Sequence, residues 1–197
     1  MFTGIIEEVG KVSKIETNGG NIDYTIQADL ATELKIDQSV AHNGVCLTVV
    51  DIKERSYKVT AIDETLNKTN LKHLQEGHLI NLERGMKMNA HLDGHIVQGH
   101  VDQVATCECA ETKDGSCEFT FSYDPKLMNV TIEKGSITIN GVSLTVVNSK
   151  LNEFSVAIIP YTYEHTTFKT LKKGDVVNLE FDVIGKYVKR LMEMHSL

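Results

Sequence analysis

The segment NGVCLTVV runs from residue 43 to residue 50, and NGVSLTVV runs from residue 140 to residue 147. Seven of the eight positions are identical, and the one that differs has Cys46 in the first copy and Ser143 in the second. The two segments lie 97 positions apart, which is close to the length of a small domain. The exchange is either drift between two small side chains, or it marks two chemical roles at two copies of one site.

The duplication extends well beyond this octapeptide. Residues 57–83 align without gaps to residues 154–180, with ten of 27 positions identical and the same offset of 97. Near the start of the chain the offset becomes 95, which pairs Gly4 with Gly99. Each repeat is therefore too long for a solenoid unit and has the size of a domain. The sequence predicts two tandem domains that join near residues 86–94.

Each repeat has the pattern of β structure. Short runs rich in Val, Ile, Thr and Tyr are separated by Asn, Gly and Asp turns, including hairpin turns at 17–21 and 112–116. One short helical pattern occurs in each repeat, at 70–77 and 167–174, and a glycine ends it. The strand-like runs of the first repeat are 9–15, 22–28, 45–52, 56–62 and 78–83. We predict an all-β fold of two similar six-stranded Greek-key barrels, each with a short helix, because closure removes exposed edges.

The tail after the second repeat has a different period. Apolar residues recur there at helical spacing with charged residues opposite, and the stripe is Ile184, Tyr187, Val188, Leu191 and His195. This pattern predicts an amphipathic C-terminal α-helix that has no counterpart in the first repeat. The predicted units are a first barrel (1–90), a second barrel (91–184) and an oligomerisation helix (185–197).

Composition excludes several classes of protein. The chain has 20 basic and 27 acidic residues, and its net charge of −7 argues against non-specific binding to nucleic acid. No apolar run approaches the roughly 20 residues of a membrane helix, and the first residues lack a basic signal segment. Four cysteines in a chain of 197 residues do not resemble a disulfide framework. We expect a cytoplasmic protein that binds neither nucleic acid nor membrane.

Polar side chains distinguish the second repeat from the first. Where the first repeat has Ile5, Asp37, Cys46 and Gly85, the second has His100, Lys134, Ser143 and Asp182, while Thr48 and Thr145 are the same in both. The second copy thus gains an imidazole, an ammonium, a hydroxyl and a carboxylate, which are the groups that acid–base catalysis uses. A purely structural duplication would also tolerate such changes, so both interpretations stay open at this point.

A metal site receives little support. His91, His95 and His100 have a spacing that suits ligands on a helix, but the glycines and alternating apolar residues of GHIVQGHVD favour a strand or turn. Cys107 and Cys109 lack a second pair of ligands. The segment GHIVQG also lacks the glycine fingerprint of dinucleotide sites, and no phosphate-binding lysine motif is present. We therefore predict neither a metal nor a cofactor.

Four motifs together resemble one family. They are the opening MFTGIIEEVG, the paired NGVCLTV and NGVSLTV, and GHIVQGHVD, and they are similar to riboflavin synthase of the lumazine-binding type built from two similar barrels. The resemblance covers essentially the whole chain. It implies a cofactor-independent transferase reaction in which one 6,7-dimethyl-8-ribityllumazine donates a four-carbon unit to another. The products would be riboflavin and 5-amino-6-(ribitylamino)uracil.

The resemblance also implies site residues in both repeats. Those implied to be catalytic are Cys46, Thr48, His100, Ser143, Thr145 and Asp182. Those implied to bind substrate in the first repeat are Gly4, Ile5, Ile6, Ser39, Cys46, Leu47, Thr48, Thr60, Ala61, Ile62, Asp63, Glu64, Thr65 and Asn81. Those in the second repeat are Gly99, His100, Val101, Lys134, Ser143, Leu144, Thr145, Ala157, Ile158, Ile159, Pro160, Tyr161, Thr162 and Asn178.

Within these sets, the resemblance groups Gly4–Ile6 with Cys46–Thr48 in the ligand pocket of the first barrel, and Gly99–Val101 with Ser143–Thr145 in that of the second. Lys134 matches a position that reaches a ligand held by another chain. Asn81 and Asn178 either hold the ligand or satisfy backbone groups. Asp93 and His42 depart from the common pattern and alter the expected shape of the pocket.

Equal binding platforms with unequal polar groups suit a reaction between two identical molecules. One lumazine must lose a proton from its C7 methyl group, and the other must be attacked at C7, so each site stabilises a different developing charge. The resemblance implies a homotrimer whose active site lies between chains, and it raises lumazine synthase as a further partner. Two alternatives remain, which are a non-catalytic lumazine-binding antenna protein and a structural barrel without ligand.

Overall fold

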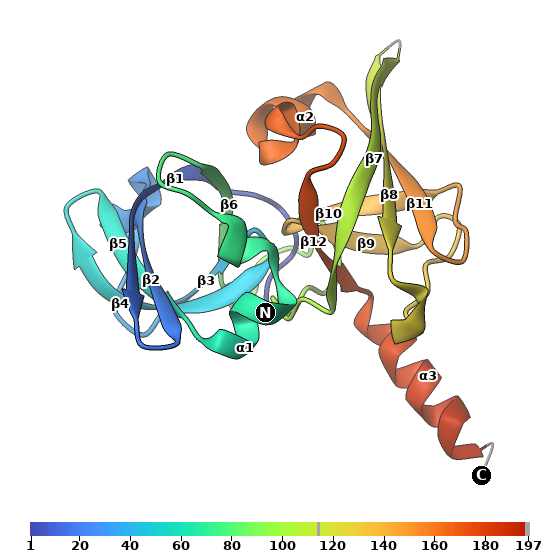
Figure 1. Cartoon of the computed structure of the whole chain (residues 1–197), viewed down its shortest axis with the longest axis horizontal. Helices are drawn as coiled ribbons and strands as arrows, with labels where there is room; N and C mark the ends of the chain where they lie inside the picture. Colours follow the sequence, from blue (N-terminus) through green and yellow to red (C-terminus); the bar gives the residue numbers. More distant parts are fainter. Residues whose placement is uncertain (114, 196–197) are drawn as a thin grey trace.

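The computed structural model describes residues 1–113 and 115–195, and this part of the chain forms two closed antiparallel barrels and a terminal helix (Figure 1). The first barrel consists of β1 (Glu8–Asn18), β2 (Asn21–Gln27), β3 (Ser39–His42), β4 (Val45–Lys53), β5 (Ser56–Ala61) and β6 (Leu79–Arg84). The second consists of β7 (Gln103–Lys113), β8 (Ser116–Tyr123), β9 (Ser136–Ile139), β10 (Val142–Val147), β11 (Glu153–Ile158) and β12 (Val176–Phe181). Around each barrel the strands follow the same order, β1-β2-β5-β4-β3-β6 and β7-β8-β11-β10-β9-β12. The predicted fold class is confirmed.

The short helices differ from the predicted ones. Residues 70–77 and 167–174 were expected to be helical, but only Asn70–His73 and Thr167–Thr170 are, and these are 3₁₀ helices. An α-helix precedes each of them, α1 (Asp63–Lys68) and α2 (Pro160–His165). Acidic residues in the first turn of α1 and a proline at the start of α2 favour these helices locally. Two further 3₁₀ helices cover Asp29–Glu33 and Pro125–Leu127.

The Asn-Gly turns of the two octapeptides bring the barrels together. Asn43 and Gly44 join β3 to β4 with φ values of 46° and 79°, and Asn140 and Gly141 join β9 to β10 with 45° and 83°. Positive φ at both positions is the conformation of a tight hairpin turn, and it favours Asn-Gly. A Cβ added to Gly44 would lie 2.8 Å from the backbone nitrogen of Gly141. The repeated segment therefore forms a close contact between the two barrels as well as a strand in each.

Each barrel has its own apolar core, and each core receives one side chain from the other repeat. Ile6, which precedes β1, packs against the second core, and Val101, which precedes β7, packs against the first. Residues 2–6 and 97–101, which carry these two side chains, are the crossing segments. They also pair with each other through a bridge between Phe2 and Val97. The N-terminus accordingly lies between the barrels (Figure 1).

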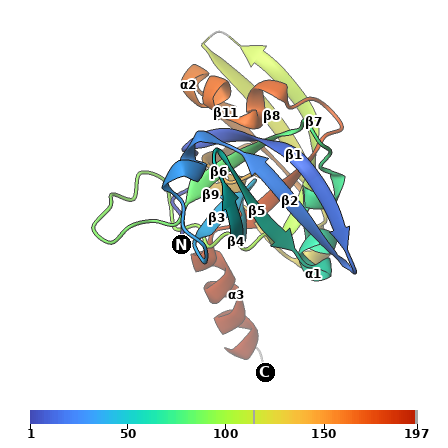
Figure 2. The ribbon, with the colours of Figure 1, turned by 90° about the vertical axis from the view of Figure 1, so that its left-hand side faces the viewer.

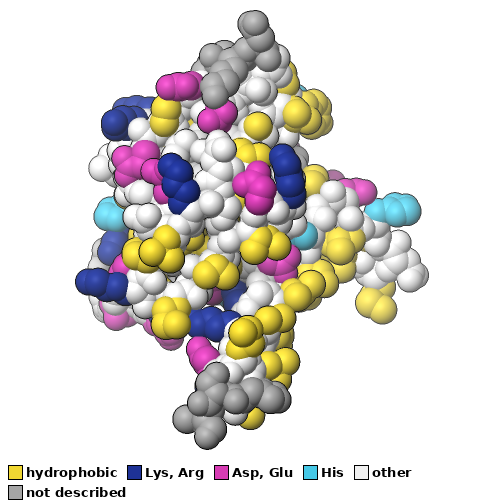
Figure 3. Space-filling model, turned by 90° about the vertical axis from the view of Figure 1, so that its right-hand side faces the viewer, with side chains coloured by type: hydrophobic (Ala, Val, Ile, Leu, Met, Phe, Trp, Pro, Cys, Tyr) yellow, Lys and Arg dark blue, Asp and Glu magenta, His cyan; other side chains and the backbone are white. Residues whose placement is uncertain are grey.

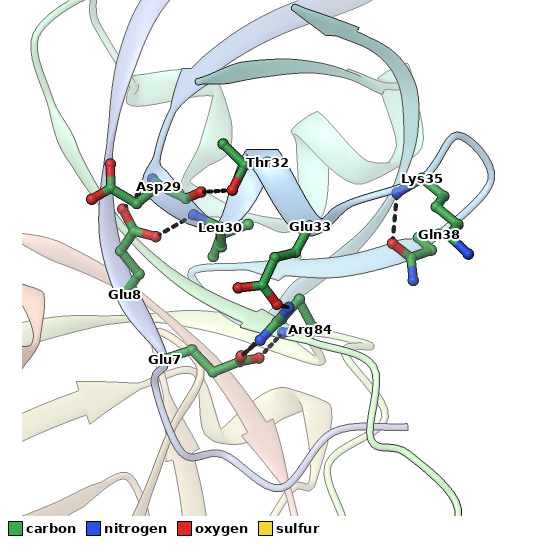
Figure 4. Close-up of polar contacts among 9 residues, drawn as sticks. All are labelled: Glu7, Glu8, Asp29, Leu30, Thr32, Glu33, Lys35, Gln38 and Arg84. Carbon is green, nitrogen blue, oxygen red and sulfur yellow. Dashed lines mark hydrogen bonds and ion pairs between the residues drawn. The ribbon is translucent and has the colours of Figure 1, made fainter. Parts of the chain in front are cut away.

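Polar contacts lie along the edge of the first barrel, around Arg84 and the 3₁₀ helix at Asp29–Glu33 (Figure 4). Arg84 at the end of β6 lies between two carboxylates, 2.6 Å from Glu7 and 2.8 Å from Glu33. Glu8 accepts hydrogen bonds from the backbone N–H groups of Asp29 and Leu30. These contacts tie the first residues of the barrel to β6 and to the 3₁₀ helix at 29–33.

The last helix, α3 (Val183–His195), extends away from both barrels (Figures 1 and 2). Apolar side chains lie along one side of it and continue onto the second barrel (Figure 3). Residues 196 and 197 of the predicted oligomerisation helix, the side chain of His195, and residue 114 of the predicted turn at 112–116 lie outside the described part. Within the described residues, no helix combines the length and apolar character needed to cross a membrane.

Candidate active site

Cys46 and Ser143 occupy equivalent places in the two barrels. Each is the second residue of its strand, β4 or β10, directly after the Asn-Gly turn. Cys46 lies opposite Ala41 in the hairpin, and Ser143 lies opposite Thr138. Both residues are half-buried, so part of each remains accessible from solution.

Each of these residues is hydrogen-bonded to a segment from the other repeat. The Ser143 backbone N–H donates to the Gly4 carbonyl oxygen at 2.8 Å, and the Cys46 N–H donates to the Gly99 carbonyl oxygen at 2.9 Å. The expected grouping of Gly4–Ile6 with Cys46 and of Gly99–Val101 with Ser143 is therefore wrong. The segments are exchanged because the side chains that follow the two glycines pack in the opposite cores.

Glycine is required at both crossing points. Gly4 and Gly99 have φ values of 79° and 80°, a region that side chains disfavour. A Cβ on Gly4 would lie 2.5 Å from the Ser143 Cβ, and a Cβ on Gly99 would lie 2.6 Å from the Cys46 Cβ. Each crossing segment thus places bare backbone directly against the residue that differs between the repeats.

Ser143 belongs to a polar group of three side chains. His95 Nδ1 lies 2.6 Å from Ser143 Oγ, and His95 Nε2 lies 3.1 Å from Thr138 Oγ1. Burial lowers the pKa of His95, and the Asp182 carboxylate opposes this effect. A lowered pKa keeps the imidazole neutral near pH 7, so one of its nitrogens is free to accept a proton. With hydrogen on Nε2, His95 donates to Thr138 and accepts from the Ser143 hydroxyl.

Cys46 has apolar surroundings instead. It packs against a cluster formed by Phe2, Ala41 and Val97. Ala41 stands where the second barrel has Thr138, so the exchange of Cys46 for Ser143 is accompanied by a change in its cross-strand partner. A thiol is a weak hydrogen-bonding group and tolerates this environment, whereas a hydroxyl would lack a strong partner there. The difference within the octapeptide is therefore matched by two different local chemistries.

Sequence reasoning did not include His95 among the site residues. The first repeat contains no equivalent of it, so comparison of the repeats gave no signal. His95 lies in the motif GHIVQGHVD, which contributes to the family resemblance, but its spacing from the other histidines suggested only metal ligation and no role beside Ser143. Among the described residues, no group of three His, Cys, Asp or Glu side chains is arranged to hold a metal ion.

His100 and Asp182, which the resemblance implies to be catalytic, lie beside Glu180 and at the start of α3, respectively. His100 is exposed, and its backbone N–H donates to the Glu180 carboxylate at 2.9 Å. The Asp182 carboxylate accepts from the Ile184 N–H at 2.9 Å, which stabilises the first turn of α3. Asp182 also acts electrostatically on His95, so it connects the helix with the polar group at Ser143.

The remaining residues of the octapeptide strands alternate between core and surface. Leu47 and Leu144 pack with the cores of their barrels, and Thr48 and Thr145 are exposed. Thr48 pairs with Ser39 across the β3–β4 hairpin. Lys134 is exposed in the turn before β9, at a position where φ is 63°.

The second predicted ligand stretch of each repeat changes from strand to helix within a few residues. Thr60 and Ala61 end β5, Ile62 is extended, and Asp63, Glu64 and Thr65 begin α1. In the second repeat Ala157 and Ile158 end β11, Ile159 is extended, and Pro160, Tyr161 and Thr162 begin α2. Ile62 and Ile159 are 52% and 60% exposed. Both repeats thus present an apolar side chain where the strand meets the helix.

Asn81 and Asn178 satisfy backbone groups between the barrels. The Asn81 side chain donates to the Asn140 carbonyl oxygen and accepts from the Thr167 N–H, at 2.9 and 2.8 Å. The Asn178 side chain makes the equivalent bonds, donating to Asn43 O at 2.8 Å and accepting from Asn70 N at 2.7 Å. Of the two expected roles, holding the ligand or satisfying backbone groups, these contacts match the satisfaction of backbone groups.

Two buried carboxylates complete the arrangement. Glu83 accepts from the N–H groups of Thr3 and Gly4, and Glu180 accepts from those of Gln98, Gly99 and His100. Burial raises the pKa of both side chains, and the hydrogen bonds from the backbone act in the opposite direction.

Comparison with known proteins agrees with the duplication. The lumazine binding domain family matches residues 3–85 and again residues 98–182. The chain is 43% identical to riboflavin synthase of Actinobacillus pleuropneumoniae, over 98% of this chain and 90% of that one. It is 37% identical to riboflavin synthase of Bacillus subtilis (strain 168), again over 98% and 90%. Among solved structures, LumP complexed with riboflavin matches with a TM-score of 0.85 and 25% identity, over 92% of this chain and 99% of that chain. LumP complexed with 6,7-dimethyl-8-(1'-D-ribityl) lumazine matches with a TM-score of 0.83, also at 25% identity, over 91% and 98%.

Proposed function

The chain belongs to the riboflavin synthase family of lumazine-binding enzymes, and from that membership we propose the reaction and the assembly. The reaction is the dismutation of two 6,7-dimethyl-8-ribityllumazine molecules. One molecule gives up a four-carbon unit and becomes 5-amino-6-(ribitylamino)uracil, and the other receives the unit and becomes riboflavin. Each barrel holds one lumazine.

The observation that carries this proposal is the chemical inequality of two otherwise equivalent places. Crossing backbone and an exposed Ile occur in both barrels, which supports two binding places of one shape. Ser143 is hydrogen-bonded to a half-buried neutral imidazole, while Cys46 packs in an apolar cluster. Two identical molecules that must play unequal roles are thereby bound in unequal surroundings.

In the second barrel, His95 and Ser143 supply proton transfer. A hydroxyl bonded to a neutral imidazole is the arrangement in which a side chain takes up or delivers a proton at a reacting atom. Thr138 fixes the imidazole through its other nitrogen, and Asp182 stabilises the imidazolium once a proton arrives. The Cys46 site contributes position and shape, because its side chain has no comparable base beside it in the described contacts.

The assembly we propose is a homotrimer built on α3. Ile184, Val188 and Met192 on α3 are 64%, 50% and 67% exposed. Together with Val130 and Ile132 they line an apolar groove of about 940 Å³. A helix of 13 residues is marginal alone in water, so an apolar side of this extent favours burial against other copies of the chain. In such a trimer the reacting pair of lumazines would come from barrels of neighbouring chains, with Lys134 near the boundary.

The test of the reaction is conversion of the lumazine by the purified full-length protein after treatment with a chelator. We expect the absorbance of the lumazine to be replaced by that of riboflavin, since the proposed chemistry uses side chains alone. Saturable binding without conversion would identify a lumazine-binding antenna protein instead. Absence of both binding and conversion would leave a structural barrel.

A further inference from the structure

The two buried carboxylates Glu83 and Glu180 occupy equivalent positions at the ends of β6 and β12. They are 4% and 3% exposed, and each spends both oxygens on backbone N–H groups of a crossing segment. Glu83 Oε1 lies 2.6 Å from Thr3 N and Oε2 lies 3.0 Å from Gly4 N. Burying a carboxylate costs free energy unless it is well hydrogen-bonded. The function of these two residues is therefore to be sought in the backbone groups to which they are bonded.

What each carboxylate holds is the backbone that touches the opposite barrel. Glu83 belongs to the first barrel, but the Gly4 it binds accepts a hydrogen bond from Ser143 of the second. Glu180 belongs to the second barrel, but the Gly99 it binds accepts from Cys46 of the first. Both contacts rely on glycines without room for a side chain, so a small displacement of either segment alters the site that it covers.

We propose that Glu83 and Glu180 are positioning residues that act crosswise, each fixing the crossing segment that completes the ligand site of the other barrel. Occupancy and geometry of the Cys46 site therefore depend on a residue of the second barrel, and those of the Ser143 site depend on a residue of the first. The proposal deepens the proposed function by adding residues that set the two sites, and it rests on that function only for the identity of the ligand.

The test uses a thiol as a local reporter in the protein without ligand. The alkylation rate of Cys46 is measured by mass spectrometry of its peptide, which separates it from Cys107, Cys109 and Cys117. We expect Glu180→Gln to raise this rate at least about fivefold, because the neutral amide cannot accept from all three N–H groups of the segment. Glu83→Gln should raise the rate clearly less than Glu180→Gln does, because Glu83 bonds the segment at Ser143 and reaches Cys46 only through the packing of Phe2 and Ala41.

The reciprocal arm uses Ser143→Cys in full-length protein that also carries Cys46→Ser. There Glu83→Gln should accelerate alkylation at position 143, and Glu180→Gln should not. The two substitutions are matched controls, because both remove a buried charge from equivalent strands and carry comparable structural costs. Turnover of lumazine by the two glutamine variants of the natural chain adds a kinetic readout, with KM raised more than kcat is lowered.

Equal acceleration at both thiols, or acceleration in the barrel that carries the substitution, would overturn the crosswise assignment. So would unchanged rates at both positions. If a glutamine variant fails to fold, Glu83→Asp or Glu180→Asp keeps the charge while shortening the reach, and the same reciprocal pattern is required of it. Because the thiol rates are measured without ligand, they stand even if the protein proves not to bind lumazine.

Discussion

We predict that the buried pair His42 and Tyr57 makes the first barrel sensitive to acid. His42 Nε2 lies 2.7 Å from the Tyr57 hydroxyl, and both residues are 1% exposed. The second barrel has Ile139 and Phe154 at the equivalent positions, both completely buried. The second barrel thus shows that an apolar pair fits at these positions. The substitution to be tested is therefore the double change His42→Ile with Tyr57→Phe, which gives the first barrel the same pair.

The expected effect follows from the pKa of His42. Burial lowers that pKa from 6.5 to about 4, so the folded barrel holds the imidazole neutral. The unfolded chain binds the proton more readily, so the stability from this site is fully present above pH 6.5 and is lost as the pH falls towards 4. At about pH 4.5 the loss in the free energy of unfolding comes to about 2.5 kcal/mol.

The assay is urea denaturation of the natural chain and the double variant at about pH 7 and pH 4.5, followed by circular dichroism. The double variant should lose about 2 to 3 kcal/mol less on acidification than the natural chain does. His42→Ile alone serves as the control, because it removes the titration but leaves the buried Tyr57 hydroxyl without this partner, at a cost of about 1 to 3 kcal/mol at both pH values. An identical acid response in the natural chain and the double variant would refute the reasoning.

Three further predictions concern the sites and the assembly. In steady-state assays, Ser143→Ala should lower kcat/KM by about a hundredfold, since it removes the partner of His95. Cys46→Ser should keep partial activity. An almost inactive Cys46→Ser would point to a covalent role for the thiol. Calorimetry with a non-reacting lumazine analogue should give two binding sites per chain. A single site at saturation would contradict the proposal that each barrel holds one lumazine. Truncation after Ile184 should give monomers in sedimentation that still bind lumazine but turn it over poorly, whereas full activity in such a monomer would exclude an active site between chains.

Much of the fold could be predicted because the same sequence pattern occurs in both repeats. The identical octapeptides set a hairpin and a strand in each barrel, and the offset of 97 carried the pattern through most of both repeats. β3 was not predicted, since Ser39–His42 is too short to show a period. α1 was not predicted either, because Asp63–Lys68 contains a single buried residue, Leu66, and so lacks an apolar stripe.

The site was harder to predict because tertiary contacts decide its grouping. Cys46 and Ser143 were identified from the difference between the repeats, but their neighbours Gly99 and Gly4 come from the opposite repeat. An alignment pairs equivalent residues and carries no information about an exchange of segments. His95 had no equivalent to be compared with, so its bond to Ser143 could be found only in the structure.

The most direct measurement is the mass balance of the reaction. Purified full-length protein is incubated with 6,7-dimethyl-8-ribityllumazine, and substrate and products are quantified by chromatography over time. The account predicts one riboflavin and one 5-amino-6-(ribitylamino)uracil for every two lumazines consumed, without added metal or nucleotide. Riboflavin formed without the matching pyrimidine product, or lumazine that stays bound and unconverted, would contradict it.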